Sequence, residues 1–174
     1  MIRSHLIYII GFMGSGKTTA GKKLASLLGW SFVDLDKKIE EYTGKTIPEI
    51  FSQKGEEWFR NIESQLLREF MSGTDAIVST GGGTPCYSDN MDFMLETGLT
   101  LYLKMTPRQL KSRLSKSKGD RPLLKDLDHE QLLSFITEKL AYRERWYSRC
   151  DITVDGMNLD INMLFSLVKS RLNI

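Results

Sequence analysis

Cysteine and histidine are scarce in this chain of 174 residues, which contains two of each. Two cysteines, Cys86 and Cys150, cannot build a disulfide framework, so we expect a reducing compartment. Two histidines, His5 and His129, argue against a metal site built from imidazole groups. An excess of one charge is also missing, because the net charge is +2 and no basic tail is present. A nucleic-acid-binding surface is therefore not expected.

Long apolar runs are missing as well. The apolar stretch near the N-terminus is interrupted by glycine after about one strand's length, which is too short for a membrane span or a signal peptide. A hydrophobic content of 41% and a charged content of 26% are ordinary for a soluble domain. We therefore expect one cytoplasmic domain over residues 1–174, which is long enough to bury a core.

A glycine-rich loop stands between a predicted strand and a predicted helix. Residues 11–18 read Gly-Phe-Met-Gly-Ser-Gly-Lys-Thr, the G-x-x-x-x-G-K-T pattern of a phosphate-binding loop. An apolar run over 6–10 predicts the strand before it, and apolar residues at helical spacing predict the helix after it. Glycines let backbone N–H groups converge on an anion at the helix N-terminus. Lys17 adds charge for the outer phosphates, and the Thr18 hydroxyl can ligate Mg²⁺.

The alternative for this loop is a glycine-rich turn that matches the pattern by chance. The strand and helix on either side disfavour it, because the motif requires that context. The sequence therefore indicates that the chain binds a nucleoside triphosphate, and the remaining question is which acceptor receives the phosphate.

Apolar segments of strand and helix length alternate along the rest of the chain. Further strands are predicted over about 31–35, 76–80, 100–105 and 151–154, with helices between them and a last helix over 160–172. Between the second and third strands, Thr46 and Glu49 are expected to form a capping box that opens a short helix to about Gln53, and Gly55 is expected to break it before a longer helix over 56–72. A helix is also predicted over 88–97. The alternation predicts a parallel sheet with helices on both faces, a three-layer α/β fold with ligands at the carboxyl ends of the strands. The region about 36–72 is large enough to be a substrate-binding subdomain.

Two more groups of residues follow strand ends and should face the same crevice as the glycine loop. Asp34 and Asp36 end the second strand, where a turn or helix cap is the alternative role. Beside a phosphate loop, Asp34 can hold Mg²⁺ or its waters, and Asp36 can accept a proton from an attacking hydroxyl. Gly81-Gly82-Gly83 follows the third strand and is either a flexible turn or a set of backbone donors for a carboxylate or hydroxyl.

One arginine lies in the helical region before the third strand. Arg60 and Glu63 are one helical turn apart, which is compatible with a weak surface ion pair. Phe59 and Phe51 lie nearby in the sequence and would add an apolar wall beside the guanidinium. This combination suits a ring-shaped anion better than open solvent.

Other arginines lie in the second half of the chain. Arg121 is in a charged loop over about 116–126, which is either solvated or a lid whose arginine closes on the transferring phosphate. Arg143, Arg145 and Arg149 lie in the helix that follows. One of these three is a candidate for the site, and spacing alone does not choose among them.

Taken in order, these motifs resemble those of the shikimate kinase family over nearly the whole chain. The matching segments are the loop 11–18, Asp34-Leu35-Asp36, Phe59-Arg60-x-x-Glu63, Gly81-Gly82-Gly83, Arg121-Pro122-Leu123-Leu124 and Tyr142-Arg143-x-x-x-Tyr147. The loop alone occurs in many kinases, but the ordered set is highly specific. The resemblance implies a P-loop, nucleoside monophosphate kinase-like fold with a five-stranded parallel sheet, a helical substrate-binding subdomain (about 36–72) and a mobile lid (about 116–126).

The resemblance also implies an activity and its partners. The activity is ATP-dependent phosphorylation of the 3-hydroxyl of shikimate, with Mg²⁺, in the biosynthesis of chorismate and aromatic amino acids. The partners would be the small molecules ATP and shikimate, with no nucleic acid and no membrane. We expect a cytoplasmic monomer, the usual state of a small kinase that closes a lid.

Residue roles follow from the same resemblance. ATP binding is implied for Gly14, Ser15, Gly16, Lys17, Thr18, Thr19, Arg113 and Arg121, and metal binding for Thr18 and Asp34. Shikimate binding is implied for Asp36, Arg60, Gly81, Gly82, Gly83 and Arg143. The implied catalytic residues are Lys17, Asp36 and Arg121, and Glu63 would orient Arg60.

The chain departs from the family pattern in two places. After the last strand the family commonly has a proline beside adenine, whereas this chain has Asp155-Gly156-Met157-Asn158. The lid is also slightly longer. The first departure affects only the contact with the base and not the residues implied in phosphoryl transfer.

Three rival functions use some of the same features. A kinase for gluconate or a nucleoside monophosphate would hold a different anion with Arg60 and Arg143. A GTP-dependent switch protein needs N-K-x-D and D-x-x-G strings, and neither occurs. A non-catalytic ATP-binding or nucleic-acid-binding module would not need a complete catalytic set, and the near-neutral charge argues against nucleic acid.

Overall fold

The computed structural model describes residues 5–71, 75–116 and 127–174, and its helices and strands alternate along the chain. In order they are β1 (Leu6–Ile10), α1 (Lys17–Leu28), β2 (Ser31–Asp34), α2 (Leu35–Thr43), α3 (Ile47–Arg68), β3 (Ala76–Ser79), α4 (Asn90–Thr97), β4 (Leu99–Lys104), α5 (Pro107–Lys116), α6 (His129–Tyr147), β5 (Ile152–Asp155) and α7 (Ile161–Leu172). Short 3-10 turns follow α3 (Glu69–Met71) and precede α4 (Thr84–Cys86). None of the described helices is long and apolar enough to cross a membrane.

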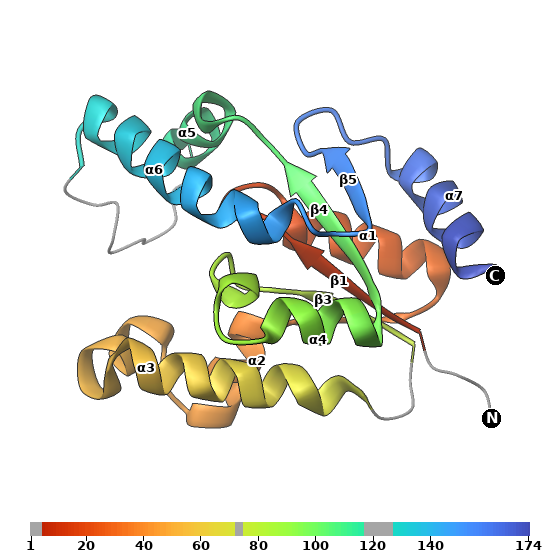
Figure 1. The fold of residues 1–174 in the computed structure, drawn as a ribbon, viewed down its shortest axis with the longest axis horizontal. Coiled ribbons are helices and arrows are strands. Elements are labelled where there is room, and N and C mark those ends of the chain that lie inside the picture. Colours follow the sequence, from red (N-terminus) through yellow and green to blue (C-terminus); the bar gives the residue numbers. More distant parts are fainter. Residues whose placement is uncertain (1–4, 72–74, 117–126) are drawn as a thin grey trace.

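The five strands form one parallel sheet in the order β2-β3-β1-β4-β5 (Figure 1). Asp34 at the end of β2 is level with Ser79 at the end of β3, and Ile9 of β1 is level with Ser79 on its other side. The loops that follow β1, β2 and β3 therefore leave the sheet at the same edge. This arrangement confirms the predicted three-layer α/β fold and brings together the loops that carry the candidate residues.

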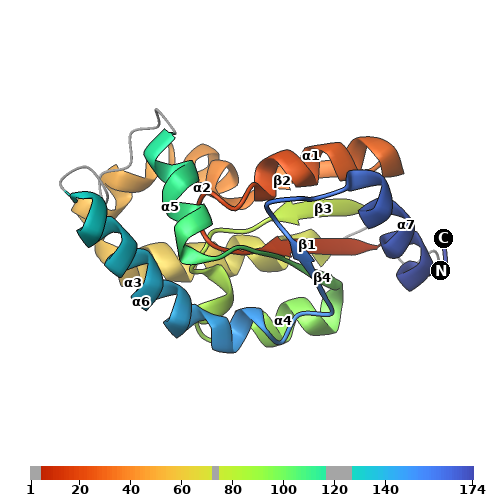
Figure 2. The same ribbon diagram turned by 90° about the horizontal axis from the view of Figure 1, so that it is seen from above.

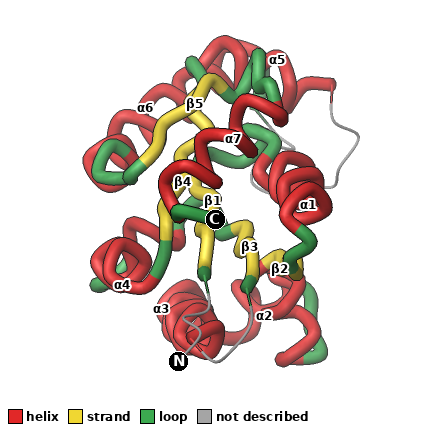
Figure 3. The backbone as a smooth tube through the Cα atoms, turned by 90° about the vertical axis from the view of Figure 1, so that its right-hand side faces the viewer, coloured by secondary structure: helices red, strands yellow, loops and turns green. Residues whose placement is uncertain are grey.

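Helices cover both faces of the sheet (Figure 2). α1 and α7 lie on one face, and α4 and α6 lie on the other. An end-on view shows the same division, with α2 and α3 beyond the β2–β3 side of the sheet (Figure 3). Tyr8 and Ile10 of β1 pack into the core on one face, whereas Ile7 and Ile9 pack into the core on the other. A continuous apolar strand is what burial on both faces requires.

The helical region between β2 and β3 follows the prediction with one difference. Thr46 and Glu49 form the expected capping box at the start of α3. Gly55 interrupts the helix with φ 82° and ψ 171°, as expected, but α3 resumes at once and ends at Arg68. Gly55 therefore divides α3 into two helical stretches, as predicted, and the difference is that the second stretch ends at Arg68 and not at about residue 72. Whether 36–72 acts as a substrate-binding subdomain stays a prediction.

One other predicted boundary shifts, and one predicted segment is not described. The helix predicted from Ser88 begins at Asn90, because Ser88 has a φ of 49°, which is not a helical conformation. The predicted lid, about 116–126, lies outside the described residues except for Lys116, which ends α5. Arg121 therefore also lies outside the described residues.

Candidate active site

The phosphate loop connects β1 to α1, as predicted. Gly14 and Gly16 adopt positive φ values of 80° and 94°, which side chains rarely allow. Gly16 caps α1 without any side-chain hydrogen bond, so the first N–H groups of the helix are directed at the site of an anion. Lys17 is buried, and its Nζ donates to the carbonyl oxygens of Gly11 at 2.8 Å and Phe12 at 3.0 Å. The amine is thus held across the loop where phosphates would lie.

Asp34 contacts both a helix and the phosphate loop. Its Oδ1 accepts from the backbone N–H of Lys37 at 3.4 Å, which caps α2, and its Oδ2 accepts from the Thr18 hydroxyl at 3.0 Å. The helix-cap role and the site role are therefore filled by one side chain. A hydroxyl and a carboxylate oxygen side by side fit Mg²⁺, which prefers oxygen ligands.

This pair would supply few of the ligands of a metal ion. The described part of the chain contains no group of three or more His, Cys, Asp or Glu side chains suited to a metal. Mg²⁺ held by Thr18 and Asp34 would complete its coordination with water and phosphate oxygens, as is usual for magnesium–nucleotide complexes.

The three predicted strand-end groups line one pocket of about 360 Å³. Its walls are Met13, Gly14, Gly16, Lys17, Thr18, Thr19, Asp34, Asp36, Ser79, Thr80, Gly81 and Gly82. A larger, mostly apolar hollow of about 690 Å³ lies beside α6 and β5, but no phosphate-loop residue lines it. The smaller pocket, where polar groups from three loops converge, is therefore the candidate active site.

Asp36 has an unusual carboxyl group in this pocket. Its pKa is raised to about 6, chiefly by burial and also by the nearby carboxylates of Glu63 and Asp34, against the opposing charges of Lys17 and Arg60. A carboxylate with a raised pKa is a stronger base than an exposed one. Asp36 is therefore chemically suited to take a proton from a hydroxyl at neutral pH.

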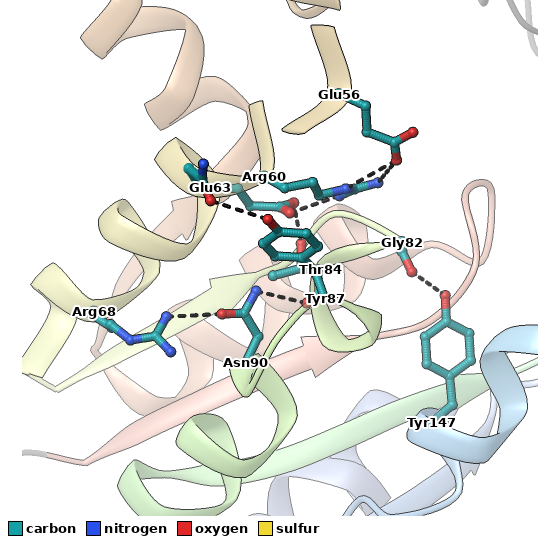
Figure 4. Close-up of polar contacts among 10 residues, drawn as sticks. Glu56, Arg60, Glu63, Arg68, Gly82, Thr84, Tyr87, Asn90 and Tyr147 are labelled. Atoms are coloured by element: carbon teal, nitrogen blue, oxygen red, sulfur yellow. Dashed lines mark hydrogen bonds and ion pairs between the residues drawn. The ribbon is translucent and has the colours of Figure 1, made fainter. Parts of the chain in front are cut away.

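Arg60 and Glu63 form a buried pair on α3 (Figure 4). Glu63 is fully buried, and the Arg60 side chain is 14% exposed, so the surface-pair alternative is wrong. Arg60 Nη1 donates to Glu63 Oε2 at 2.7 Å, and the guanidinium lies 5.1 Å from the centre of the Phe59 ring. Phe59 in turn contacts Phe51. The apolar wall inferred from the sequence is present.

Glu63 also contacts the glycine loop after β3. Its Oε1 accepts from the Thr84 hydroxyl at 2.5 Å, and the Thr84 carbonyl accepts from Asn90 Nδ2 at 3.0 Å. Asn90 Oδ1 accepts from Arg68 of α3 at 2.9 Å (Figure 4). Thr84 and Asn90 are fully buried, and sequence reasoning missed both. Spacing gave no signal for them, because they act through tertiary contacts.

Only one of the three candidate arginines in and just after α6 lies beside the glycine loop in the structure. The Arg143 guanidinium lies 5.2 Å from the centre of the Phe12 ring, and a Cβ at Gly82 would be 2.9 Å from its Nη1. This Nη1 is buried and has no hydrogen-bond partner in the described part of the chain. Arg145 packs instead on Trp146, and Arg149 pairs with Asp92. Arg143 is thus the arginine beside the glycine loop.

Arg113 lies on the other side of the phosphate loop. Its Nη1 donates to the Ser15 carbonyl at 3.2 Å and its Nη2 to the Gly156 carbonyl at 3.1 Å. A second pocket of about 260 Å³ is lined by Ser15, Gly16, Thr19, Ala20, Lys23, Leu103, Arg113, Gly156, Met157, Leu159 and Ile161. Arg113 and the Gly156–Met157 turn therefore face one pocket beside the phosphate loop.

A sequence model of the family described as shikimate kinase matches residues 13–171. The chain belongs to the shikimate kinase family. A shikimate kinase of Parabacteroides distasonis is 46% identical over 150 residues, which span 86% of this chain and 87% of that protein. This membership separates the chain from GTP-dependent switch proteins and from non-catalytic modules.

Solved structures of family members share the fold. The crystal structure of shikimate kinase from Bacteroides thetaiotaomicron superposes with a TM-score of 0.90 at 36% identity and covers 98% of this chain and 99% of that one. Shikimate kinase from Acinetobacter baumannii, in complex with shikimate, has a TM-score of 0.83 at 34% identity, with 98% and 94% covered. The P-loop kinase fold inferred from the sequence is confirmed.

Proposed function

We propose that this chain transfers the γ-phosphoryl group of ATP to the 3-hydroxyl of shikimate, giving shikimate 3-phosphate and ADP in chorismate and aromatic amino acid biosynthesis. The observation that carries this proposal is the shared pocket. Phosphate-loop residues and Asp36 line one cavity, and Arg60 and Arg143 flank the glycine loop at its edge. A phosphate donor and an anionic acceptor would therefore meet at contact distance.

The donor half consists of Gly14–Thr19 with Asp34 and Arg113. Backbone N–H groups and Lys17 would bind the phosphates, Arg113 would contact the base, and Thr18 and Asp34, whose side chains already meet, would hold Mg²⁺. The metal, when bound, neutralises charge on the β- and γ-phosphates. Lys17 adds positive charge where negative charge develops during transfer.

The acceptor half consists of Asp36, the glycine loop and two arginines. Asp36 orients the attacking hydroxyl and accepts its proton as the new oxygen–phosphorus bond forms and the bond to ADP breaks. Arg60 and Arg143 hold the carboxylate of the acid with charge-assisted hydrogen bonds. The backbone of Gly81, Gly82 and Gly83 contacts the ring substituents, and Glu63 fixes Arg60.

Three further parts of the proposal rest on the sequence. Arg121 stabilises the transferring phosphate from a lid (about 116–126) that excludes water, and residues about 36–72 form the substrate-binding subdomain. The enzyme acts as a cytoplasmic monomer on small molecules, without nucleic acid or membrane. Sedimentation of the purified chain with and without ATP would test the monomer directly.

A coupled assay of ADP release tests the function. Shikimate, quinate and gluconate are supplied in parallel with ATP and Mg²⁺. We expect kcat/KM for shikimate to exceed that for the other two acids by at least about 100-fold, because a site built for one set of hydroxyls leaves buried groups unpaired with another. Comparable or faster turnover of gluconate would identify a different small-molecule kinase.

Replacing Gly83 by alanine should disturb Arg60 without disturbing the fold. Gly83 has φ −91° and ψ −13°, which alanine adopts freely, but a Cβ there would overlap Nη2 of Arg60 and lie 2.8 Å from its Cζ. The guanidinium must therefore move. We expect KM for shikimate to rise about 10-fold, as expected for a weakened charge-assisted hydrogen bond.

KM for ATP is the internal control for Gly83→Ala, since the donor half does not contact Arg60. It should stay within about twofold of the wild-type value, and the melting temperature should change little. Unchanged KM for shikimate would show that the Arg60 guanidinium does not bind the acid from its observed position.

A further inference from the structure

Tyr147, the last residue of α6, reaches the glycine loop from the opposite side to Arg60 (Figure 4). Its ring is fully buried, and its Oη donates to the carbonyl oxygen of Gly82 at 2.5 Å. Arg143 is one helical turn earlier on α6, and its Nη1 lies against the same glycine. One helix face thus presents a guanidinium and a phenol to one residue of the acceptor half.

The bond to Gly82 fixes a peptide plane. The C=O of Gly82 and the N–H of Gly83 belong to one trans peptide unit, so they point in opposite directions. Because the carbonyl points at Tyr147 on α6, the Gly83 N–H points away from α6. Holding the carbonyl therefore sets the direction of the next backbone donor.

Three consecutive glycines need such an external contact. Their own side chains cannot restrict the backbone, so an untethered loop has many conformations to lose when a ligand binds. Thr84 is anchored to Glu63 on one side of the loop, and Ser79 belongs to β3 on the other. Tyr147 supplies the contact in the middle.

The phenol remains a donor over the neutral pH range. Burial raises the pKa of Tyr147 above its ordinary value, and the nearby Arg143 guanidinium opposes that rise. A buried hydroxyl needs a partner, and the described structure provides the Gly82 carbonyl.

We propose that Tyr147 is a positioning residue for the acceptor half: its hydrogen bond to the Gly82 carbonyl holds the glycine loop in the conformation that binds the acid. The residue acts through Gly82 and contacts neither ATP nor the reacting atoms. This inference rests on the proposed function, because the glycine loop matters in this way only if it binds the acceptor.

Tyr102 of β4 is a matched control in the same core. It is buried like Tyr147, and the two ring centroids are 4.9 Å apart. Its hydroxyl donates to Glu144 of α6 at 2.8 Å and not to the glycine loop. Removing either phenolic oxygen deletes one hydrogen bond, to a carboxylate for Tyr102 and to the Gly82 carbonyl for Tyr147, so only the second deletion acts on the glycine loop.

The test compares Tyr147→Phe with Tyr102→Phe in steady-state kinetics with both substrates varied. Loss of a hydrogen bond to the loop should raise KM for shikimate about 5–10-fold in Tyr147→Phe. KM for ATP should stay within about twofold in the same variant. Tyr102→Phe should leave both KM values within about twofold, even where its melting temperature falls as much as that of Tyr147→Phe.

A conservative variant completes the test. Placing 4-aminophenylalanine at 147 restores an N–H donor, and KM for shikimate should return to within about twofold of wild type. If the phenylalanine variant does not fold, 4-fluorophenylalanine fills the same volume without a donor and replaces it in the comparison.

Three results would overturn the positioning role. These are a wild-type KM for shikimate in the variant that lacks the donor, an equal rise in the KM values for ATP and shikimate, or no recovery with 4-aminophenylalanine. A failure of the proposed function is distinct from these, because the wild-type chain would then not phosphorylate shikimate at all.

Discussion

Replacing Asp36 by asparagine should lower kcat for shikimate phosphorylation by about 10²–10⁴-fold, the usual contribution of a positioned general base. Asparagine keeps the size of the side chain but cannot accept the proton of the attacking hydroxyl. Asp36 lines the pocket with the phosphate loop, and its raised pKa of about 6 makes it basic enough for this step near neutral pH. Steady-state kinetics with both substrates varied would measure the loss.

ATP binding and folding are the controls for this variant. Asp36 is assigned to the acceptor and not to ATP, so KM for ATP should stay within about threefold, as for loss of an interaction made in the transition state. Turnover close to the wild-type rate, or a loss of ATP binding as large as the loss of kcat, would contradict the role assigned to Asp36.

The same variant should be more stable than the wild type when ATP and Mg²⁺ are absent. The Asp36 carboxyl has a pKa of about 6 in the folded chain against 3.8 ordinarily, so the folded chain binds more protons between these values. The free energy of unfolding therefore falls as pH rises through this range, and the full cost of ionising Asp36 in the folded chain is present above it. Because asparagine carries no charge, the free energy of unfolding at pH 7.5 should be about 2–3 kcal/mol higher in the variant. Near pH 4 the two chains should unfold alike.

Replacing Arg143 by alanine should raise KM for shikimate about 10–100-fold, which is the effect of losing hydrogen bonds between a guanidinium and a carboxylate. The deletion removes no hydrogen bond of the buried Nη1, which has no partner in the described residues, but it does remove the interaction of the guanidinium with the Tyr147 phenol. The ring of Phe12 loses a packing partner, but KM for ATP should change by no more than about threefold.

Arg145→Ala provides the matched control for this prediction. It removes the same side chain from the same helix, two positions further on, where the guanidinium packs on Tyr142 and Trp146 at the surface. Both KM values should stay within about twofold. An equal effect of the two substitutions would show that Arg143 acts through net charge or helix stability and not through contact with the acid.

The sequence was sufficient to predict those parts of the site that are short motifs directly after a strand. The phosphate loop, Asp34, Asp36 and the three glycines each follow a strand, and parallel strands end at one edge of a sheet. Their convergence on one pocket could therefore be predicted from the sequence. The same local signals predicted the capping box of α3 and the kink at Gly55.

Contacts between distant segments could not be predicted in this way. Glu63, Thr84 and Asn90 form one buried chain of hydrogen bonds, although nothing in their spacing connects them. The choice of Arg143 over Arg145 depends on which face of α6 packs against the glycine loop. Tyr147 stood in a recognised motif, but its partner is a backbone carbonyl, which no pattern of side chains reveals.

Identification of the phosphorylated product tests the central claim most directly, because the claim is that one pocket joins a phosphate donor to one hydroxyl of an acid. The chain is incubated with ATP, Mg²⁺ and shikimate, and the product is examined by phosphorus and proton NMR. We expect one phosphate monoester, on the 3-hydroxyl of shikimate, for each ADP formed. ADP formed together with free phosphate and unchanged shikimate, or a phosphate on another hydroxyl, would contradict the account.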